Sequence, residues 1–430
     1  MISDMRIRNL ILMVLVALFC GGALAWKQLP AYCEGSMLPY DYSQEEPFTW
    51  PDSLTPRYCA YVARHGARYM TGEKKFRKLE KALHESEVRG NLTAEGRGML
   101  AMIDSIRSLS EGRWGELSAV GIAEEQHLGT TMHDDFPPVG SAAMPVTTIS
   151  SFVPRAMMTM YEFNHAMMLA NDSLDVVAAS GHTYSPLVYF FATDSAYSAY
   201  RKDGDWREVV ERFERDSLLT GGVKRLFRSV RGFSSKELRG LTMEMYSVLQ
   251  SRRAMGLSAP TDRWMTPAEY RSCWLVSNLT HYLRNNVTPL DSRPVAEAVS
   301  QLVETIIDRA DMTMAGGGEQ PCFDGYFGHA ETLLPLLSVL RIPGCHAMPL
   351  DWSELSREWQ LQRITPLGAN FRLILFSAPS GIAYAAVRLN GRNVEPLKGK
   401  GRIVEWRELS AYWQNILGSL TLQTVPQNQK

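Results

Sequence analysis

The segment YCAYVARHGAR, residues 58–68, determines the expected fold, because an apolar run ends there in a histidine between two arginines. Its first six residues are aromatic, β-branched or small, which predicts a buried strand, and Gly66 permits a sharp turn after that strand. Ligands of open α/β sheets bind at the carboxyl ends of the strands. We therefore expect Arg64, His65 and Arg68 to lie at the centre of a binding site in an α/β protein.

These three side chains suit a phosphate group. Arg64 and Arg68 each present a planar set of donors that matches phosphate oxygens, and both stay charged at any working pH. A neutral nitrogen of His65 is a nucleophile that can form a covalent intermediate. A lone histidine is usually an ordinary core or surface residue, but three cationic groups are costly to bury together without an anion. The segment therefore predicts phosphoryl transfer through a phosphohistidine.

Two further segments place functional side chains at the ends of expected strands. Residues 146–151 read as a strand, and Arg155 follows at the start of a helix, where free backbone N–H groups favour an anion. Residues 322–328 lead into His329, which can donate to a phosphoryl group, and into Glu331, which can protonate a leaving oxygen. The alternatives are a surface ion pair for Arg155 and a helix-dipole interaction for Glu331.

Two motifs resemble those of a known enzyme family. RHGAR, residues 64–68, resembles the RHGxR signature of the histidine acid phosphatases, the second branch of the histidine phosphatase superfamily. YFGHAETLLPLL, residues 326–337, resembles the His-Ala-Glu segment of the multiple inositol polyphosphate phosphatases, where most of the wider family has His-Asp. The similarity runs in register from about Tyr58 to about Trp406. Met70 departs from the pattern, because the family usually has proline there.

The resemblance implies both a fold and a mechanism. The implied fold is an α/β sandwich with a central, mostly parallel sheet flanked by helices and an inserted α-helical cap over the strand ends. His65 would attack phosphorus while Arg64, Arg68, His329 and the family's third phosphate-binding arginine stabilise the charge. Arg155 stands at the position of that third arginine. Glu331 would protonate the leaving alcohol, a role that rests on the resemblance and on its spacing from His329.

The His-Ala-Glu form implies that the substrates are inositol polyphosphates, namely phytate and lower inositol phosphates. One alternative is a broad-specificity acid phosphatase that acts on sugar phosphates or other small monoesters. Another is a non-catalytic anion-binding protein on the same fold, although the intact motif residues argue against it. A mutase-like phosphotransferase is disfavoured, since nothing in the sequence indicates a cytosolic enzyme.

Lys74, Lys75 and His182 are candidates for contacts with further phosphates. The two lysines follow Arg68 closely enough to lean over the pocket, as the corresponding loop does in related phosphatases. A lysine-rich run is also typical of a solvated helix face, so both interpretations stay open. His182 follows an expected strand at 175–179 and is a weaker candidate.

A second basic segment lies in the expected cap. Residues 220–240 contain six basic side chains and one acidic side chain, and residues 223–230 have the apolar spacing of an amphipathic helix. The basic face of that helix is either solvated or forms a wall toward a polyanionic substrate. The candidate wall residues are Lys224, Arg225, Arg228 and Arg231.

Composition limits the classes of partner. Lysine and arginine total 45 against 46 aspartates and glutamates, so the overall charge gives no reason to expect nucleic acid. Cysteine spacing shows no metal-binding pattern, HExxH and calcium-loop motifs are absent, and the glycines at 316–318 do not fit a nucleotide-binding loop. We therefore expect a small phosphorylated molecule as the ligand, with no metal and no cofactor. The sequence does not indicate an oligomeric state.

Residues 1–25 resemble a secretory signal peptide, with two arginines, an apolar stretch and a small-residue Ala-Leu-Ala site at 23–25. An uncleaved membrane anchor is the alternative, but the apolar stretch of about 11 residues is short for a membrane span. We expect an exported protein, periplasmic or extracellular, that has no stable membrane insertion after cleavage.

The rest of the chain is expected to form two interleaved parts. Residues 26–184 and 301–430 read as the two halves of an α/β phosphatase domain, and residues 185–300 read as an inserted α-helical cap. Thr93 and Ser118 have the spacing of helix N-caps, and we expect the helices that follow them to cover the sheet.

Overall fold

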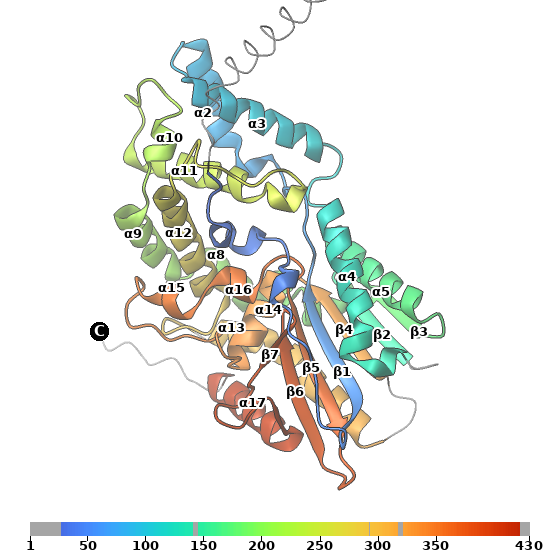
Figure 1. Cartoon of the computed structure of the whole chain (residues 1–430). Helices are drawn as coiled ribbons and strands as arrows, with labels where there is room; N and C mark the ends of the chain where they lie inside the picture. The colour runs from blue at the N-terminus through green and yellow to red at the C-terminus, as the bar shows by residue number, and fades with distance from the viewer. Residues whose placement is uncertain (1–26, 141–144, 292, 317–320, 422–430) are drawn as a thin grey trace, which may run out of the picture.

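The structure is a computed structural model, and it describes residues 27–140, 145–291, 293–316 and 321–421. Its centre is an eight-stranded mixed sheet in the order β3-β2-β4-β1-β5-β6-β7, with β8 paired to β6 (Figure 1). The strands are β1 (Thr55–Arg64), β2 (Pro145–Ser150), β3 (Asp175–Ser180), β4 (Phe323–Gly328), β5 (Asn370–Ser377), β6 (Ala383–Leu389), β7 (Arg392–Val394) and β8 (Ile403–Glu405).

The predicted α/β class is confirmed, and its parallel part is the half that carries the motifs. Strands β3, β2, β4 and β1 run parallel. On the other side of β1 the pairing is antiparallel: β5 pairs with β1, β6 with β5, and both β7 and β8 with β6. β1 pairs with β4 so that Arg64 lies opposite Gly328, and β2 pairs with β4 so that Ser150 lies opposite Phe327. This register brings the carboxyl ends of three strands, and the residues that follow them, to one edge of the sheet.

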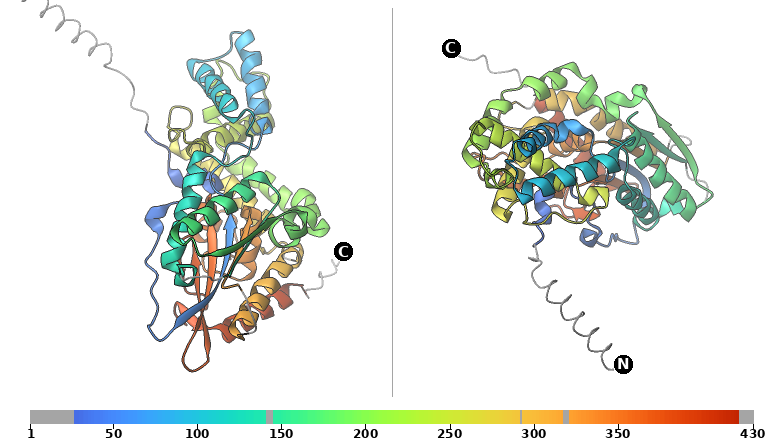
Figure 2. Two further views of the ribbon diagram at one scale, coloured as in Figure 1. Left: turned by 90° about the vertical axis from the view of Figure 1, so that its right-hand side faces the viewer. Right: turned by 90° about the horizontal axis from the view of Figure 1, so that it is seen from above.

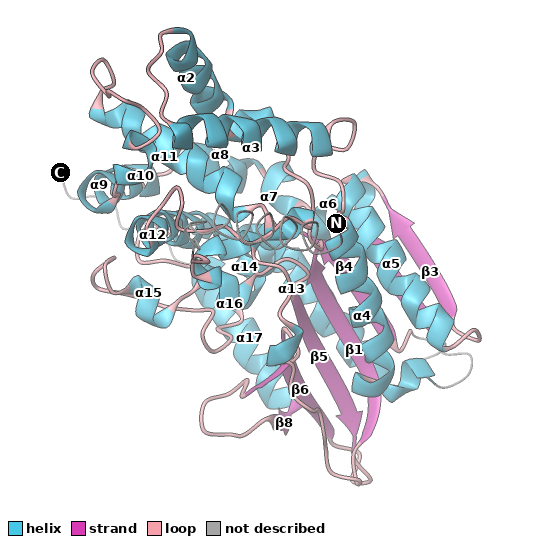
Figure 3. Cartoon of the chain, turned by 45° about the horizontal axis from the view of Figure 1, so that its top comes forward, coloured by secondary structure: helices cyan, strands magenta, loops and turns pink. Residues whose placement is uncertain are grey.

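Helices cover both faces of the sheet (Figure 3). On one face, α4 (Ala119–Asp135) and α5 (Pro154–Ala170) pack on alternating strand residues such as Tyr61 and Phe323. On the other face, α13 (Arg293–Met314), α14 (Ala330–Val339) and α17 (Trp406–Thr421) pack on Tyr58, Val62 and their neighbours. Because successive strand residues point to opposite faces, β1 contributes to both cores, which explains its nearly continuous apolar sequence.

A third core lies above the carboxyl ends of the strands, in what we call the helical layer (Figure 2). It is built from α2 (Arg77–Val88), α3 (Ala94–Ser110), α10 (Gly221–Lys224), α11 (Ser235–Gln250) and the first half of α12 (Pro267–Asn285). The layer therefore does not coincide with the predicted insertion at 185–300. Residues 188–206 and the second half of α12 pack instead with the core that contains α13 and α14.

Thr93 and Ser118 cap α3 and α4 as predicted, each accepting a hydrogen bond from a backbone N–H of the first turn. The prediction that both helices cover the sheet is correct for α4 and wrong for α3. The buried residues of α3, from Met99 to Ile106, pack in the helical layer against α2 and the chain around Val223. Amphipathic spacing identifies a buried face but does not say which neighbour covers it.

The remaining helical elements are short or connect these layers. They are α6 (Ser185–Val188), α7 (Phe190–Thr193), α8 (Ser195–Asp203), α9 (Trp206–Ser217), α15 (Leu355–Glu358) and α16 (Leu361–Ile364). Six 3₁₀ turns complete the described chain: η1 (Ala31–Met37), η2 (Tyr42–Gln44), η3 (Glu73–Lys75), η4 (Pro137–Gly140), η5 (His182–Tyr184) and η6 (Arg253–Met255).

The predicted signal peptide lies outside the described residues. Within the part that is described, no helix combines the length and apolar character needed to cross a membrane. The cysteines at 33, 59, 273, 322 and 345 are all buried and free.

Candidate active site

The six predicted catalytic residues line one cavity of about 320 Å³ at the edge where the parallel strands end. Arg64 and His65 come from the end of β1, Arg155 from the first turn of α5 after β2, and His329 from the residue that follows β4. The cavity is lined by Ser36, Met37, Arg64, His65, Arg68, Met70, Thr71, Lys75, Arg155, Ser247, Gln250, Ser251, Ser277, His281, Arg284, His329, Ala330 and Glu331.

The ring of His65 is held in one tautomer. Its Nδ1 lies 2.9 Å from the carbonyl oxygen of Gly66. Since a carbonyl only accepts, Nδ1 carries the proton and Nε2 has the free lone pair. Burial lowers the pKa of His65 well below its usual value, and the charges of Arg155 and Arg64 lower it further. His65 is therefore a neutral imidazole with a nucleophilic Nε2.

Three guanidinium groups surround this nitrogen. Arg64 is fixed by donation to the carbonyl oxygens of Ser36 (2.6 Å) and Thr365 (2.7 Å). The Nε atoms of Arg64, Arg68 and Arg155 are buried without a hydrogen-bond partner in the described chain. Burial lowers the pKa of Arg64 to about 10 and that of Arg68 to about 9, so both remain charged at neutral pH. Buried charged donors without partners indicate an anion site.

His329 is bound at both ring nitrogens by protein. Its Nε2 lies 3.0 Å from Ser151 Oγ, and Arg155 Nη2 lies 3.3 Å from its Nδ1. Arginine only donates, so Nδ1 accepts and Nε2 carries the proton. Burial and the charge of Arg155 lower the pKa of His329 to about 3. The imidazole is thus neutral and fixed beside the arginines, 5.4 Å from the ring of His65. Both of its nitrogens are occupied, so this arrangement leaves no free N–H for the expected donation from His329 to a phosphoryl group.

Glu331 forms an ion pair with Arg201 of α8, with Oε1 and Nη2 3.1 Å apart. Arg201 lies over the rings of Phe191 and Tyr197 and is nearly buried. Burial raises the pKa of Glu331, but the opposing effects, of which the charge of Arg201 is the largest, outweigh burial and lower it to about 2. Sequence reasoning missed Arg201, since nothing distinguishes it from the other charged residues of its helix.

The buried neutral histidines make the fold sensitive to acid. An unfolded chain takes up a proton on each histidine near its usual pKa of 6.5, whereas burial lowers the pKa of His329 to about 3 and that of His281 to about 4. The unfolded state therefore binds more protons below pH 6.5, and stability falls as the pH falls, by about 1.4 kcal/mol per pH unit for each such histidine.

Burial raises the pKa of Glu34 and Glu124 to about 7, which stabilises the fold as the pH falls toward 4.5 and offsets the histidines there. Thermal unfolding followed by circular dichroism should therefore show Tm falling clearly from about pH 4.5 to about pH 3. Inorganic phosphate should restore part of the loss, because an anion among the arginines binds only the folded state. A Tm that is constant over this range, or unaffected by phosphate, would contradict these protonation states.

The predicted substrate-binding residues separate into two groups. Lys75, in the 3₁₀ turn η3, lines the cavity. Lys74 precedes it but is not in the lining. His182 is also outside the lining, and its ring packs on Phe152 with ring centroids 3.9 Å apart. The ring contact accounts for the position of His182 without a ligand.

The predicted basic wall is wrong in both its structure and its position. The helix expected at 223–230 ends at Lys224, because the following carbonyl groups bond elsewhere: Leu226 O accepts from Thr93 N–H. Arg225 is paired with Glu269 at 2.6 Å, and Arg228 donates to the carbonyl of Leu92. The four residues Lys224, Arg225, Arg228 and Arg231 are all absent from the cavity lining.

The wall opposite His65 comes instead from α11 and α12. Ser277, His281 and Arg284 of α12 all line the cavity. His281 Nδ1 and Arg284 Nε are buried without a hydrogen-bond partner in the described chain. These residues were missed, although their spacing of four and three places them on one helix face and is visible in the sequence.

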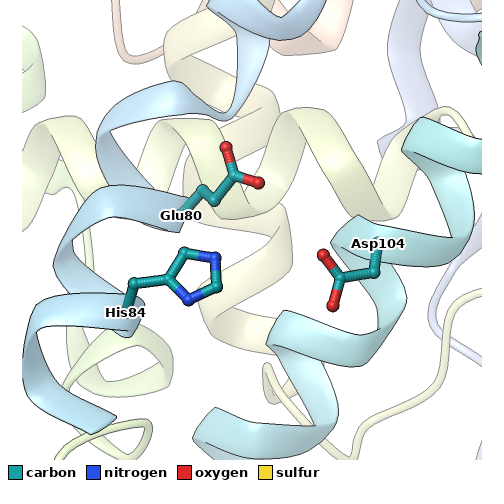
Figure 4. A group of neighbouring side chains, drawn as sticks. All are labelled: Glu80, His84 and Asp104. Atoms are coloured by element: carbon teal, nitrogen blue, oxygen red, sulfur yellow. The ribbon is translucent and has the colours of Figure 1, made fainter. Parts of the chain in front are cut away.

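Two other features of the described chain do not contribute to this site. A larger cavity of about 580 Å³, lined by residues such as Tyr32, Tyr40 and Gln362, contains no histidine nucleophile. Glu80 and His84 of α2 and Asp104 of α3 have ligand atoms within 4.8 Å of one another, which could suit a metal ion (Figure 4). Glu80 is already ion-paired with Arg107, and none of the three lines the active-site cavity.

The chain resembles known proteins in its fold. No protein-family model matches the chain, and no curated protein matches its sequence. Experimentally determined structures of phosphatases match its fold. The multiple inositol polyphosphate phosphatase of Bifidobacterium longum bound to inositol hexasulfate is 13% identical, with a TM-score of 0.73 over 88% of this chain and 96% of that chain.

The same Bifidobacterium longum enzyme bound to phosphate matches with a TM-score of 0.69 and 13% identity, over 92% of this chain and 99% of that chain. The phytase from D. castellii matches at 0.64 and 16% identity, over 92% of this chain and 86% of that chain. The chain has the fold of these phosphatases. At such low identity the match establishes the fold alone, and the chemistry has to be argued from the cavity.

Proposed function

We propose that the protein is a phosphomonoesterase that hydrolyses inositol polyphosphates through a phosphohistidine on His65. The observation that carries the proposal is the composition of the single cavity around this residue. Arg64, Arg68 and Arg155 surround the nucleophile, Lys75 and Arg284 extend the positive charge, and Glu331 is the one carboxylate among the lining residues. The fold shared with inositol polyphosphate phosphatases and phytases supports the same conclusion.

In the first step, Nε2 of His65 attacks phosphorus and the bond to the ester oxygen breaks. The arginines stabilise the charge on the equatorial oxygens, which is the main contribution of a protein to phosphoryl transfer. Glu331 gives a proton to the leaving oxygen, whose alkoxide would otherwise be a poor leaving group. The products of this step are the free alcohol and phosphohistidine.

The proton on Glu331 needs a source, because the pKa of this carboxyl, lowered to about 2 mainly by Arg201, keeps it ionised in the free site. A phosphate monoester has a second pKa of about 6 and binds at mildly acidic pH as a monoanion that carries a proton. Its negative charge also offsets that of Arg201. We infer that the substrate supplies the proton that Glu331 delivers to the leaving oxygen.

In the second step, water attacks the phosphorus of phosphohistidine and the N–P bond breaks. Glu331, now ionised, accepts the proton of the attacking water and gives it to the departing inorganic phosphate, which restores the carboxylate of the free site. Neutral His65 is restored with its Nδ1 proton in place. Only side chains of the cavity take part in this scheme.

The substrate class follows from the distribution of charge. One phosphate carries about −1.5 to −2 charges and is matched by the arginines around His65. Lys75 and Arg284 add positive charge to the lining, and burial lowers the pKa of both groups, so that each favours a neutralising anion. A substrate with several phosphates supplies that anion, whereas a simple monoester leaves both groups unpaired.

Removal of the positive charges of Lys75 and Arg284 tests this assignment. Lys75→Met and Arg284→Met should each lower kcat/KM for inositol hexakisphosphate about tenfold or more, the loss expected for a charged hydrogen bond, and change kcat/KM for an aryl phosphate by less than about twofold. Lys74→Met is the matched control, since it removes the same charge one residue away and outside the lining.

Equal losses on both substrates would mean that Lys75 and Arg284 act on the reacting phosphate and would discard the polyphosphate assignment. Turnover of the aryl ester alone would indicate a broad-specificity acid phosphatase. A folded protein that releases phosphate from neither substrate would be an anion-binding protein on this fold.

The leader-like residues 1–25 support a further proposal, that the protein acts in the periplasm or outside the cell.

A further inference from the structure

The turn that presents His65 is connected to a buried carboxylate through a single peptide group. The carbonyl of Gly66 accepts the Nδ1 proton of His65 at 2.9 Å. The N–H of Ala67 donates to Oε2 of Glu124 at 2.6 Å. These two bonds use the opposite ends of the same planar amide, the one between Gly66 and Ala67. Glu124, this amide and the imidazole of His65 therefore form one continuous chain of hydrogen bonds.

Glu124 lies in α4, which packs beside β1 under this turn (Figure 1). Its side chain is 1% exposed, and its second oxygen, Oε1, accepts the N–H of Tyr40 at 2.8 Å. Burial raises the pKa of Glu124 to about 7, while the N–H groups of Tyr40 and Ala67 and the charge of Arg64 act in the opposite direction. Both oxygens thus accept from fixed N–H donors, an arrangement that suits the carboxylate and not the carboxylic acid, so Glu124 is ionised at and above neutral pH.

Two glycines permit this close approach. A Cβ on Gly121 would lie 2.1 Å from the carbonyl oxygen of Ala67, and a Cβ on Gly66 would lie 2.9 Å from the carbonyl oxygen of Gly121. Neither position can hold a side chain without moving the helix away from the turn. The N–H of Gly66 is fixed as well, by donation to Oγ1 of Thr159 at 3.0 Å. The N–H groups of Gly66 and Ala67 are therefore both fixed, and they fix the orientation of the Gly66–Ala67 amide.

We propose that Glu124 is a positioning residue that acts on His65 through the Gly66–Ala67 amide. The inference rests on the proposed phosphatase activity of the same site. A carboxylate that accepts from the N–H end of an amide polarises it, and the carbonyl end then becomes a stronger acceptor. The carbonyl holds the Nδ1 proton, so Nε2 stays the nucleophilic nitrogen. As the N–P bond forms, positive charge develops on the ring and the polarised carbonyl stabilises it.

No proton moves through the amide in this scheme, and no bond of the amide is broken. Its role is the one that outer hydrogen-bond partners have for metal-bound histidines, where they fix the tautomer and the ring orientation. Neighbouring Glu125 does not share this role. Neither of its oxygens has a hydrogen-bond partner in the described chain, and burial together with the charge of Glu124 raises its pKa well above the usual value.

The test is Glu124→Gln, which keeps the shape but replaces one accepting oxygen by an NH₂ group that faces a donor. We expect kcat for inositol hexakisphosphate to fall about 10- to 100-fold, the loss of one charge-assisted hydrogen bond, with KM changed by less than about twofold. Glu125→Gln is the matched control, because it is an isosteric change in a carboxyl that is already neutral, and it should leave kcat within about twofold.

A second measurement does not depend on turnover. In protein labelled with ¹⁵N-histidine, with the signals of His65 assigned by their loss in His65→Gln, the wild type and Glu125→Gln should show protonated Nδ1 and unprotonated Nε2. Glu124→Gln should show a mixture of tautomers. Protonated Nε2 in the wild type, or a wild-type spectrum and kcat in Glu124→Gln, would overturn the proposal. Absence of turnover by the wild type would refute the phosphatase and leave the spectrum to decide the link to Glu124.

Discussion

Replacing His65 by alanine should lower phosphate release from inositol hexakisphosphate by at least about 10⁴-fold, because the covalent route loses its nucleophile. The arginines alone can bind the substrate and stabilise charge, but water would have to attack the phosphate ester directly. KM should change much less than kcat, since Arg64, Arg68 and Arg155 remain. Initial rates with a colorimetric phosphate assay measure both parameters.

His182→Ala is the matched control for this experiment. It removes an imidazole that packs on Phe152 outside the cavity lining, and it should retain nearly full activity. A His65→Ala protein that is folded and keeps more than about one hundredth of the wild-type kcat would show that the reaction does not pass through His65.

Replacing Glu331 by glutamine should have the second largest effect, and the size of that effect should depend on the leaving group. With inositol phosphates the departing alkoxide needs a proton, so we expect kcat to fall by about 10² to 10⁴. With p-nitrophenyl phosphate the leaving group departs without a proton, so phosphorylation of His65 should be slowed far less. Single-turnover rates with the two substrates separate this step from hydrolysis of phosphohistidine.

Glu34→Gln is the matched control for this experiment. Glu34 is fully buried and ion-paired with Arg253, outside the cavity lining, so its replacement changes stability without affecting leaving-group dependence. If Glu331→Gln lowers the single-turnover rate of His65 phosphorylation equally for both substrates, Glu331 orders the arginines and is not the general acid.

Much of the fold was predictable because the strands carry strong local signals. β1 contains a nearly continuous apolar run that ends in polar side chains, and β4, although it contains Asp324, leads directly into His329. These patterns predicted both the sheet and the edge at which Arg64, His65 and His329 meet. Arg155 was found for the same reason, since it follows β2 directly. Residues that follow parallel strands converge whatever the rest of the chain does.

The far wall of the cavity was not predictable in this way. The segment from Lys224 to Arg231 has helical spacing, but tertiary hydrogen bonds with Thr93 and Asn91 end the helix early. Arg225 is paired with Glu269 of α12, and Arg228 donates to the carbonyl of Leu92 just before α3, contacts that no local pattern records. Arg201 and Glu331 are 130 positions apart and meet only in the folded chain. Glu124 likewise reads as one acid among several on a helix.

The most direct test of the account is to trap the phosphoenzyme. Purified protein mixed rapidly with inositol hexakisphosphate, quenched in alkali and digested, should give one peptide that contains His65 and carries a phosphoryl group stable to base and labile to acid. The same peptide should be unmodified after incubation with inositol alone. If phosphate is released while His65 stays unmodified on the timescale of a single turnover, the phosphohistidine mechanism is contradicted.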